Sequence, residues 1–158
     1  MPTIFKPPTP PIYDGKKSVF LAGTIDNGNS ADWQAEVEQL LTDEEIIILN
    51  PRRNDWDASW EQTISNPKFK EQVEWELDGL DRVDAIFMYF AAGSKSPITL
   101  LELGLHAASG KVIIVCPNDF WRRGNLEVIA ERYGIPLFEK IEAGLQELQV
   151  VLGSNKPN

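Results

Sequence analysis

Short apolar runs recur along the chain and alternate with segments of helical periodicity. Strands are predicted at residues 18–22, 46–49, 84–90 and 111–116, with a further short one at 135–137. Because most of these runs have no polar face, each strand is expected to be covered on both sides, as in a parallel sheet. The alternation predicts an α/β, three-layer fold of the Rossmann-like type, with a four- to five-stranded, mainly parallel sheet between two layers of helices.

The segments between these strands have the apolar spacing and the terminal residues of helices. Asn66-Pro67 and Ser96-Pro97 each place a polar residue before a proline, which favours the first position of a helix. Helices are predicted at about 31–42, from Pro67 to the third strand, at about 97–110, at 125–133 and at 139–152.

Composition divides the chain into three parts. Five prolines within residues 2–11 predict an extended arm with little regular structure over residues 1–17. Residues 18–152 are predicted to form a single domain, since this length suffices for one hydrophobic core. Residues 153–158 are predicted to be a polar tail.

Charge and residue usage exclude several classes of function. A formal net charge of −9 and a pI of about 4.6 argue against a nucleic acid polymer or a membrane surface as partner. There is no apolar run of about 18 residues and no signal-peptide pattern, and the single Cys116 fits a reducing compartment, so a cytoplasmic location is expected. One Cys and one His argue against a zinc site. Neither a GxxxxGK[ST] loop nor a GxGxxG fingerprint is present, and no metal or cofactor is expected.

Glu102 is the most unusual residue of the chain. It is the only charged side chain between Pro97 and Ser109, and helical spacing places it on the same side as Ile98 and Leu105. A carboxylate on an apolar helix side costs several kcal/mol unless it is paired or functional. Two interpretations stay open here, which are a Glu satisfied by an Arg or a backbone donor, and a Glu that performs chemistry.

A second carboxylate has a similar setting. Glu76 lies within the apolar stripe of the preceding helix, three residues after Val73 and four before Leu80. The structural alternative is a Glu at the rim of the stripe, paired with Arg or Lys. Two partly buried carboxylates are the working parts of glycosyl transfer, in which one attacks the anomeric carbon and the other handles the proton of the leaving group.

The loops that follow the first two predicted strands are candidate substrate-binding segments. Ligands of open α/β sheets bind at the carboxyl ends of the strands. Gly23 and Thr24 end the first strand, and the loop over residues 50–57, with Asp55 and Trp56, follows the second. The aromatic rings of this loop suit a flat base, although tryptophans that merely fix a solvated loop would give the same pattern.

Several motifs resemble those of the nucleoside 2-deoxyribosyltransferase family. The resemblance covers roughly residues 18–126 and includes Phe20 to Ile25, Asn50 to Arg53, Leu101-Glu102-Leu103-Gly104 and Ser109 to Lys111. It implies a flavodoxin-like fold and exchange of nucleobases between 2′-deoxynucleosides. The expected partners are a deoxynucleoside and a free nucleobase.

The resemblance also implies roles for individual residues. Glu102 matches the family's nucleophile, which forms a covalent deoxyribosyl-enzyme, and Glu76 matches an acidic position that handles the nucleobase proton. Asn125 matches an Asn that reaches the sugar 5′-hydroxyl from a neighbouring subunit, so a homo-oligomer with shared active sites is expected. Ser96 stands where the family carries an acid.

Two other functions remain open at this stage. One is hydrolysis of the N-glycosidic bond of a nucleoside or nucleoside 5′-monophosphate, for which Ser94, Ser96, Arg52 and Arg53 would offer phosphate contacts. The other is a non-catalytic nucleoside-binding domain, in which Glu102 would be satisfied by a structural partner.

Overall fold

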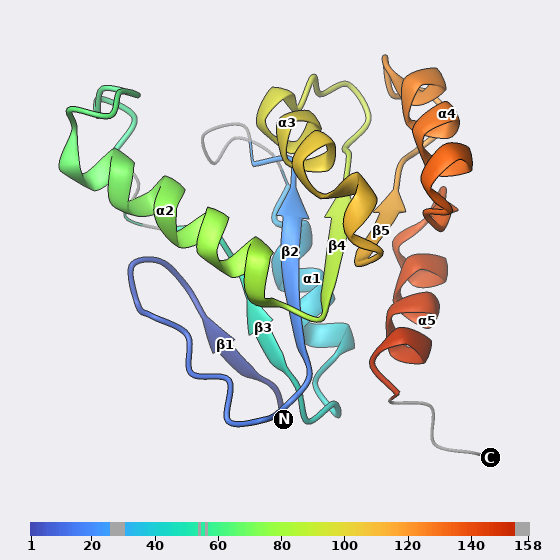
Figure 1. Ribbon diagram of the computed structural model, residues 1–158, viewed down its shortest axis with the longest axis horizontal. Helices are drawn as coiled ribbons and strands as arrows, with labels where there is room; N and C mark the ends of the chain where they lie inside the picture. The colour runs from blue at the N-terminus through green and yellow to red at the C-terminus, as the bar shows by residue number, and fades with distance from the viewer. Residues whose placement is uncertain (26–30, 54, 56, 154–158) are drawn as a thin grey trace.

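The computed structural model describes residues 1–25, 31–53, 55 and 57–153. Within this part of the chain, six strands form one parallel sheet in the order β1-β3-β2-β4-β5-β6 (Figure 1). The strands are β1 (Thr3–Phe5), β2 (Ser18–Gly23), β3 (Ile47–Leu49), β4 (Ala85–Tyr89), β5 (Val112–Val115) and β6 (Leu137–Phe138).

The α/β class and the parallel sheet are confirmed, but the predicted number of strands is wrong. The sheet has six strands because Thr3–Phe5, within the proline-rich arm, forms the edge strand β1 against β3. This segment precedes most of the prolines, so its N–H groups are available for pairing, and Asn50 N donates to the Phe5 carbonyl at 2.9 Å.

The order of the strands creates a crevice in the middle of the sheet. After β2 the chain moves outward to β3, and it then returns across β2 to form β4 on the other side. Apart from the added edge strand, this is the flavodoxin-like order, in which ligands bind where the winding reverses. The crevice therefore lies at the carboxyl ends of β2 and β4.

Helices cover both faces of the sheet, as expected for buried parallel strands. Helices α2 (Pro67–Arg82), α3 (Pro97–His106) and α4 (Arg123–Tyr133) pack on one face, with a short 3-10 turn (Ala107–Ser109) after α3 (Figure 1). Helices α1 (Trp33–Leu40) and α5 (Ile141–Val151) pack on the other.

Helix α2 is held close to the sheet. The Asn66 side chain accepts from the N–H groups of Lys68 and Phe69, which caps its first turn. At Gly79 a Cβ atom would lie 2.8 Å from Leu49 Cδ2 and 3.0 Å from a Phe20 ring carbon, so only glycine permits this approach. At the other end of the helix, Lys111 Nζ donates to the Leu80 carbonyl at 2.7 Å.

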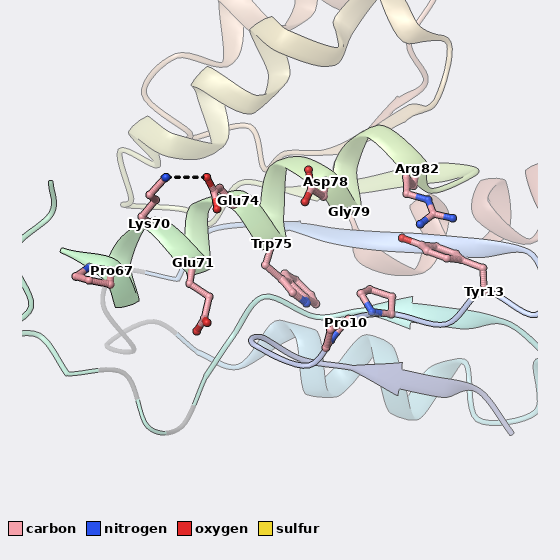
Figure 2. Close-up of a pocket in the computed structure, with 11 residues that line it drawn as sticks. Pro10, Tyr13, Pro67, Lys70, Glu71, Glu74, Trp75, Asp78, Gly79 and Arg82 are labelled. Atoms are coloured by element: carbon pink, nitrogen blue, oxygen red, sulfur yellow. Dashed lines mark ion pairs between the residues drawn. The ribbon is translucent and has the colours of Figure 1, made fainter. Parts of the chain in front are cut away.

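The arm packs against the side of α2 that carries Trp75 and Gly79, and the two segments line a groove of about 500 Å³. Figure 2 shows Trp75 reaching from α2 toward Pro10, with Arg82 beside the Tyr13 ring. Trp75 Nε1 donates to the Thr9 carbonyl at 2.8 Å, and the Arg82 guanidinium lies 4.5 Å from the centre of the Tyr13 ring. These contacts fix the helix that carries Glu76.

In α3, Glu102 is buried, but its two apolar neighbours in the helical spacing, Ile98 and Leu105, are exposed. Glu102 faces inward together with Thr99, Leu103 and His106, whereas Ile98, Leu101 and Leu105 are about 60% exposed. The helix has apolar residues all round, so helical spacing alone did not identify its inner face. Glu102 is thus buried at the edge of this exposed stripe, and Ile98 lines the same cleft as Glu102.

Candidate active site

A cleft of about 700 Å³ opens at the carboxyl ends of the central strands, lined by segments that follow β2, β3 and β4. Its walls come from the end of β2, the loop after β3, one side of α2 and the start of α3. Gly23, Thr24, Glu76, Ser96 and Glu102 all line it, so the fold brings together residues separated by up to one half of the chain.

Glu102 lies in this cleft with only 8% of its surface exposed. Burial, together with the nearby negative charge of Glu76, raises the pKa of its carboxyl group to about 8. In the part of the chain that the structure describes, no hydrogen bond or ion pair reaches the Glu102 carboxyl. The structural alternative, a Glu satisfied by an Arg or a backbone donor, therefore has no support among those residues.

Glu76 is partly buried on α2. Burial raises the pKa of its carboxyl group to about 7, and a hydrogen bond from Gln72 acts in the opposite direction. Gln72 Nε2 lies 2.8 Å from Glu76 Oε1. The predicted alternative of an Arg or Lys partner is not observed among the described residues, because the neighbour is an uncharged amide.

The loop after β3 contributes two arginines to the cleft. Arg52 Nε donates to Gln34 Oε1 at 3.1 Å and lies 3.5 Å from Asp32 Oδ1. Arg53 forms two parallel hydrogen bonds with Asp55, each 3.0 Å long, and its guanidinium lies 5.5 Å from the centre of the Trp60 ring. Both guanidinium groups are therefore anchored at the edge of the cleft.

Three hydroxyl groups meet at the start of α3. Thr24 Oγ1 lies 2.5 Å from Ser96 Oγ and 3.2 Å from Ser94 Oγ, and Ser94 Oγ lies 2.9 Å from Ser96 Oγ. The Ala91 N–H also donates to Thr24 Oγ1 at 3.0 Å. Ser96 has left-handed backbone angles (φ 47°, ψ 54°), which are unusual for a residue other than glycine. The cluster holds this strained residue at the helix entrance.

Gly23 lies where the cleft meets the sheet, at a position that has no room for a side chain. A Cβ atom there would collide with the Tyr89 carbonyl and would lie 2.7 Å from a ring carbon of Trp33. Trp33 is itself fixed, because its Nε1 donates to the Thr24 carbonyl at 2.9 Å. Any larger residue at this position would displace the ends of β2 and β4.

Three predicted site residues lie elsewhere or outside the description. Asp55 is exposed and does not line the cleft, although it holds Arg53, which does. Asn125 is exposed on α4 and does not line the cleft of its own chain. Trp56 falls outside the described residues.

Gln72 belongs to the site, although it was not among the residues predicted from the sequence. It lies one helical turn before Glu76, and this i, i+4 spacing is the sequence feature that could have indicated a contact between the two side chains. The contacts of Gln72 with Pro51 and Arg53 have no counterpart in local spacing, since they join segments about 20 residues apart.

The described residues contain no group of three or more His, Cys, Asp or Glu side chains arranged to hold a metal ion. They also contain no helix with both the length and the apolarity needed to cross a membrane.

Comparison with known proteins identifies the family to which this sequence is similar. A search of curated proteins found no match. A family model described as "nucleoside 2-deoxyribosyltransferase like" matches residues 16–120, a span that contains β2 to β5, Glu76 and Glu102. That match covers more than half of the 158 residues, and with the two carboxylates facing one cleft it leads to one conclusion: the chain belongs to the nucleoside 2-deoxyribosyltransferase-like family, whose members are transferase-like, nucleoside-handling enzymes.

Proposed function

We propose that the protein transfers the 2-deoxyribosyl group between nucleobases of 2′-deoxynucleosides, through a covalent intermediate on Glu102. One observation carries the proposal: Glu102 is buried in the cleft beside a second carboxyl group, with no cation or backbone donor on it among the described residues. A buried carboxyl group without a stabilising partner is destabilising, and its proximity to Glu76 is typical of an acid and nucleophile pair.

Near neutral pH the two carboxyl groups share one proton, and the reactive form is the one that carries it on Glu76. In the first half-reaction, the ionised Glu102 carboxylate of this form attacks C1′ of the sugar. A bond forms between a Glu102 oxygen and C1′, and the bond between C1′ and the base nitrogen breaks. The electron pair of that bond moves to the base, which takes the proton of the Glu76 carboxyl group. The products are a deoxyribosyl ester of Glu102, a neutral free base and ionised Glu76.

In the second half-reaction, a different base attacks C1′ from the side that the first base left. The new bond to nitrogen forms as the ester bond to Glu102 breaks, and ionised Glu76 takes the proton of the incoming base. Both carboxyl groups return to their starting states. Two successive displacements at C1′ retain its configuration.

A second copy of the chain completes the proposed site. Ile98, Leu101 and Leu105 form a stripe on α3, each about 60% exposed, and Ile98 lines the same cleft as Glu102. Large exposed apolar side chains in one row are typical of protein interfaces. We infer a homo-oligomer in which Asn125 of a neighbouring subunit contacts the sugar 5′-hydroxyl.

Hydrolysis is the second candidate function. Arg52 and Arg53 line the same cleft as Thr24 and Ser96, which would suit a 5′-phosphate. Arg53 already forms a bidentate pair with Asp55, which leaves less of its charge for a substrate phosphate. This observation favours an uncharged nucleoside, and therefore transfer between nucleosides.

The deciding experiment supplies deoxyadenosine, with and without a second free base, and follows products by chromatography. A new deoxynucleoside that requires the second base supports transfer, whereas free deoxyribose regardless of acceptor supports hydrolysis. Glu102→Gln is expected to abolish either reaction, and Glu74→Gln, at an exposed position of α2, serves as the control. Full activity of the Glu102→Gln protein would exclude Glu102 as nucleophile, and the absence of turnover with any deoxynucleoside or its monophosphate would favour a binding domain.

A further inference from the structure

Both polar atoms of the Gln72 side chain, Oε1 and Nε2, form hydrogen bonds. It is buried on α2, and its Nε2 donates to the Pro51 carbonyl at 3.2 Å and to Glu76 Oε1 at 2.8 Å. Its Oε1 accepts from Arg53 Nη1 at 3.4 Å. A flipped amide would place its oxygen against two acceptors and its NH₂ group against a guanidinium, so the contacts permit one orientation.

We propose that Gln72 is a positioning residue for proton exchange with the nucleobase, holding Oε1 of Glu76 so that Oε2 is presented to the cleft. This inference rests on the proposed function. The carbonyl oxygen of a protonated carboxyl group is a better acceptor for an amide N–H than its hydroxyl oxygen. The Gln72 donor on Oε1 therefore favours the proton of Glu76 on Oε2, the oxygen that we infer reaches the substrate.

The hydrogen bond from Gln72 also suits a carboxyl group that must both donate and accept a proton during the reaction. Glu76 has to release a proton to the leaving base and recover one from the incoming base. General acid–base catalysis is most effective when the pKa lies near the working pH. Burial raises the pKa of Glu76, and the Gln72 donor offsets part of that rise by favouring the charged form.

Gln72 also ties Glu76 to the loop after β3. Arg53, which bonds to the Gln72 oxygen, is fixed by its two hydrogen bonds to Asp55. The position of Glu76 is thus set from the same loop that borders the cleft. Among the described residues, the other charged groups lining this cleft are Asp32, Arg52, Arg53 and Glu102, and the charge of Glu76 acts on Glu102 directly.

The test uses Gln72→Met, which keeps the length of the side chain but removes the amide. Glu74→Gln, on an exposed side of α2, is the matched control. Two substrates are compared, 2′-deoxyguanosine and N7-methyl-2′-deoxyguanosine. The methylated base already carries a positive charge, so it leaves as a neutral molecule without receiving a proton. For a protein that accepts only pyrimidines, 2′-deoxycytidine and its N3-methyl derivative replace this pair.

With Gln72→Met, kcat for the unmethylated nucleoside is expected to fall at least about tenfold. The KM is expected to change little, and turnover of the methylated nucleoside is expected to stay near the wild-type rate. Carbon NMR of the Glu76 carboxyl group is expected to show a higher pKa in the variant, because the donor that favours the charged form is gone. The control variant is expected to match the wild type in all these measurements.

Two results would overturn the inference. An equal loss with both substrates would mean that Gln72 is only structural, and an unchanged kcat together with an unchanged Glu76 pKa would mean that it has no role. Failure of the proposed function is separate, since wild-type protein would then turn over none of these nucleosides and the inference would fall with it.

Discussion

The Thr24 hydroxyl at the end of β2 lies 2.5 Å from the Ser96 hydroxyl that precedes α3. This contact joins the strand that ends at the floor of the cleft to the helix that carries Glu102. Ser96 has left-handed backbone angles there, and its hydroxyl also meets Ser94 Oγ at 2.9 Å. The direction in which α3 leaves the sheet is therefore set by a small buried group of hydroxyls.

Thr24→Val is expected to lower the free energy of unfolding by about 1–3 kcal/mol, because it leaves buried hydroxyls and the Ala91 N–H without an acceptor. It is also expected to reduce turnover, since the start of α3 loses its anchor. Urea unfolding and initial rates measure the two effects. Thr42→Val, at an exposed position, is the control. A Thr24→Val protein as stable as the control would show that the cluster does not hold the helix.

The buried carboxyl groups predict a stability that falls as the pH rises. The pKa of Glu102 is about 8 in the folded protein against an ordinary value of 4.5, so the folded state retains a proton that the unfolded chain releases. Stability from this group is complete below pH 4.5 and is lost as the pH rises through about 8. Because one pKa unit corresponds to about 1.4 kcal/mol, the loss amounts to a few kcal/mol.

Glu102→Gln is expected to remove most of this pH dependence, since the amide does not titrate. Urea unfolding of both proteins at acidic and alkaline pH measures the difference, and comparing the two proteins cancels the titrating groups that do not interact with Glu102. A wild-type protein whose stability does not decline relative to the variant would contradict the raised pKa of Glu102.

The rate of turnover is expected to follow a bell-shaped pH profile with its maximum between about pH 7 and 8, where the pair of carboxyl groups shares one proton. At lower pH both carboxyl groups are protonated and no nucleophile remains, and at higher pH both are ionised and no acid remains. Glu76→Gln is expected to reduce the rate and to move the acidic limb to lower pH, because the charge that raises the pKa of Glu102 is removed. An acidic limb that stays in place would show that the two carboxyl groups do not interact.

If the exposed stripe of Ile98, Leu101 and Leu105 on α3 forms the interface between subunits, a charged residue introduced there is expected to dissociate the oligomer. Leu101→Glu is expected to yield monomers in sedimentation experiments and to lower turnover, because the charge would be buried against a second copy. Leu40→Glu, on α1, changes a leucine of similar exposure on another face and is expected to leave the oligomer intact. A wild-type protein that sediments as a monomer would exclude the shared site.

Mixed oligomers test whether Asn125 acts across the interface. Asn125→Ala is expected to raise the KM for the nucleoside, and Glu102→Gln is expected to be inactive. In oligomers that contain both variants, some sites would combine an intact Glu102 from one subunit with an intact Asn125 from the other. Activity above that of either variant alone is the expected result, and no recovery in the mixed oligomers would place the role of Asn125 within its own subunit or nowhere.

The sequence determined most of the framework. Strands such as 84–90 and 111–116 have so little polar surface that they must be covered on both faces, and Pro67 and Pro97 mark where α2 and α3 begin. The single charge within residues 97–109 marked Glu102 as a buried carboxyl group, since few alternatives exist for an acid in an apolar helix. The prediction that Glu76 and Glu102 share one crevice is met by the cleft that both residues line.

Only the tertiary structure determined which side of each helix is buried and which distant segments are in contact, because the spacing of apolar residues does not distinguish these alternatives. Helix α3 is apolar on all sides, so only its docking on the sheet determined that Glu102 is buried while Ile98 and Leu105 are exposed. Strand β1 formed inside a proline-rich arm because its partner β3 offered a free edge, which is a property of the sheet and not of the arm. The clamp on Gln72 likewise depends on Pro51 and Arg53 returning beside α2, and side chains brought together from distant segments leave no local pattern to read.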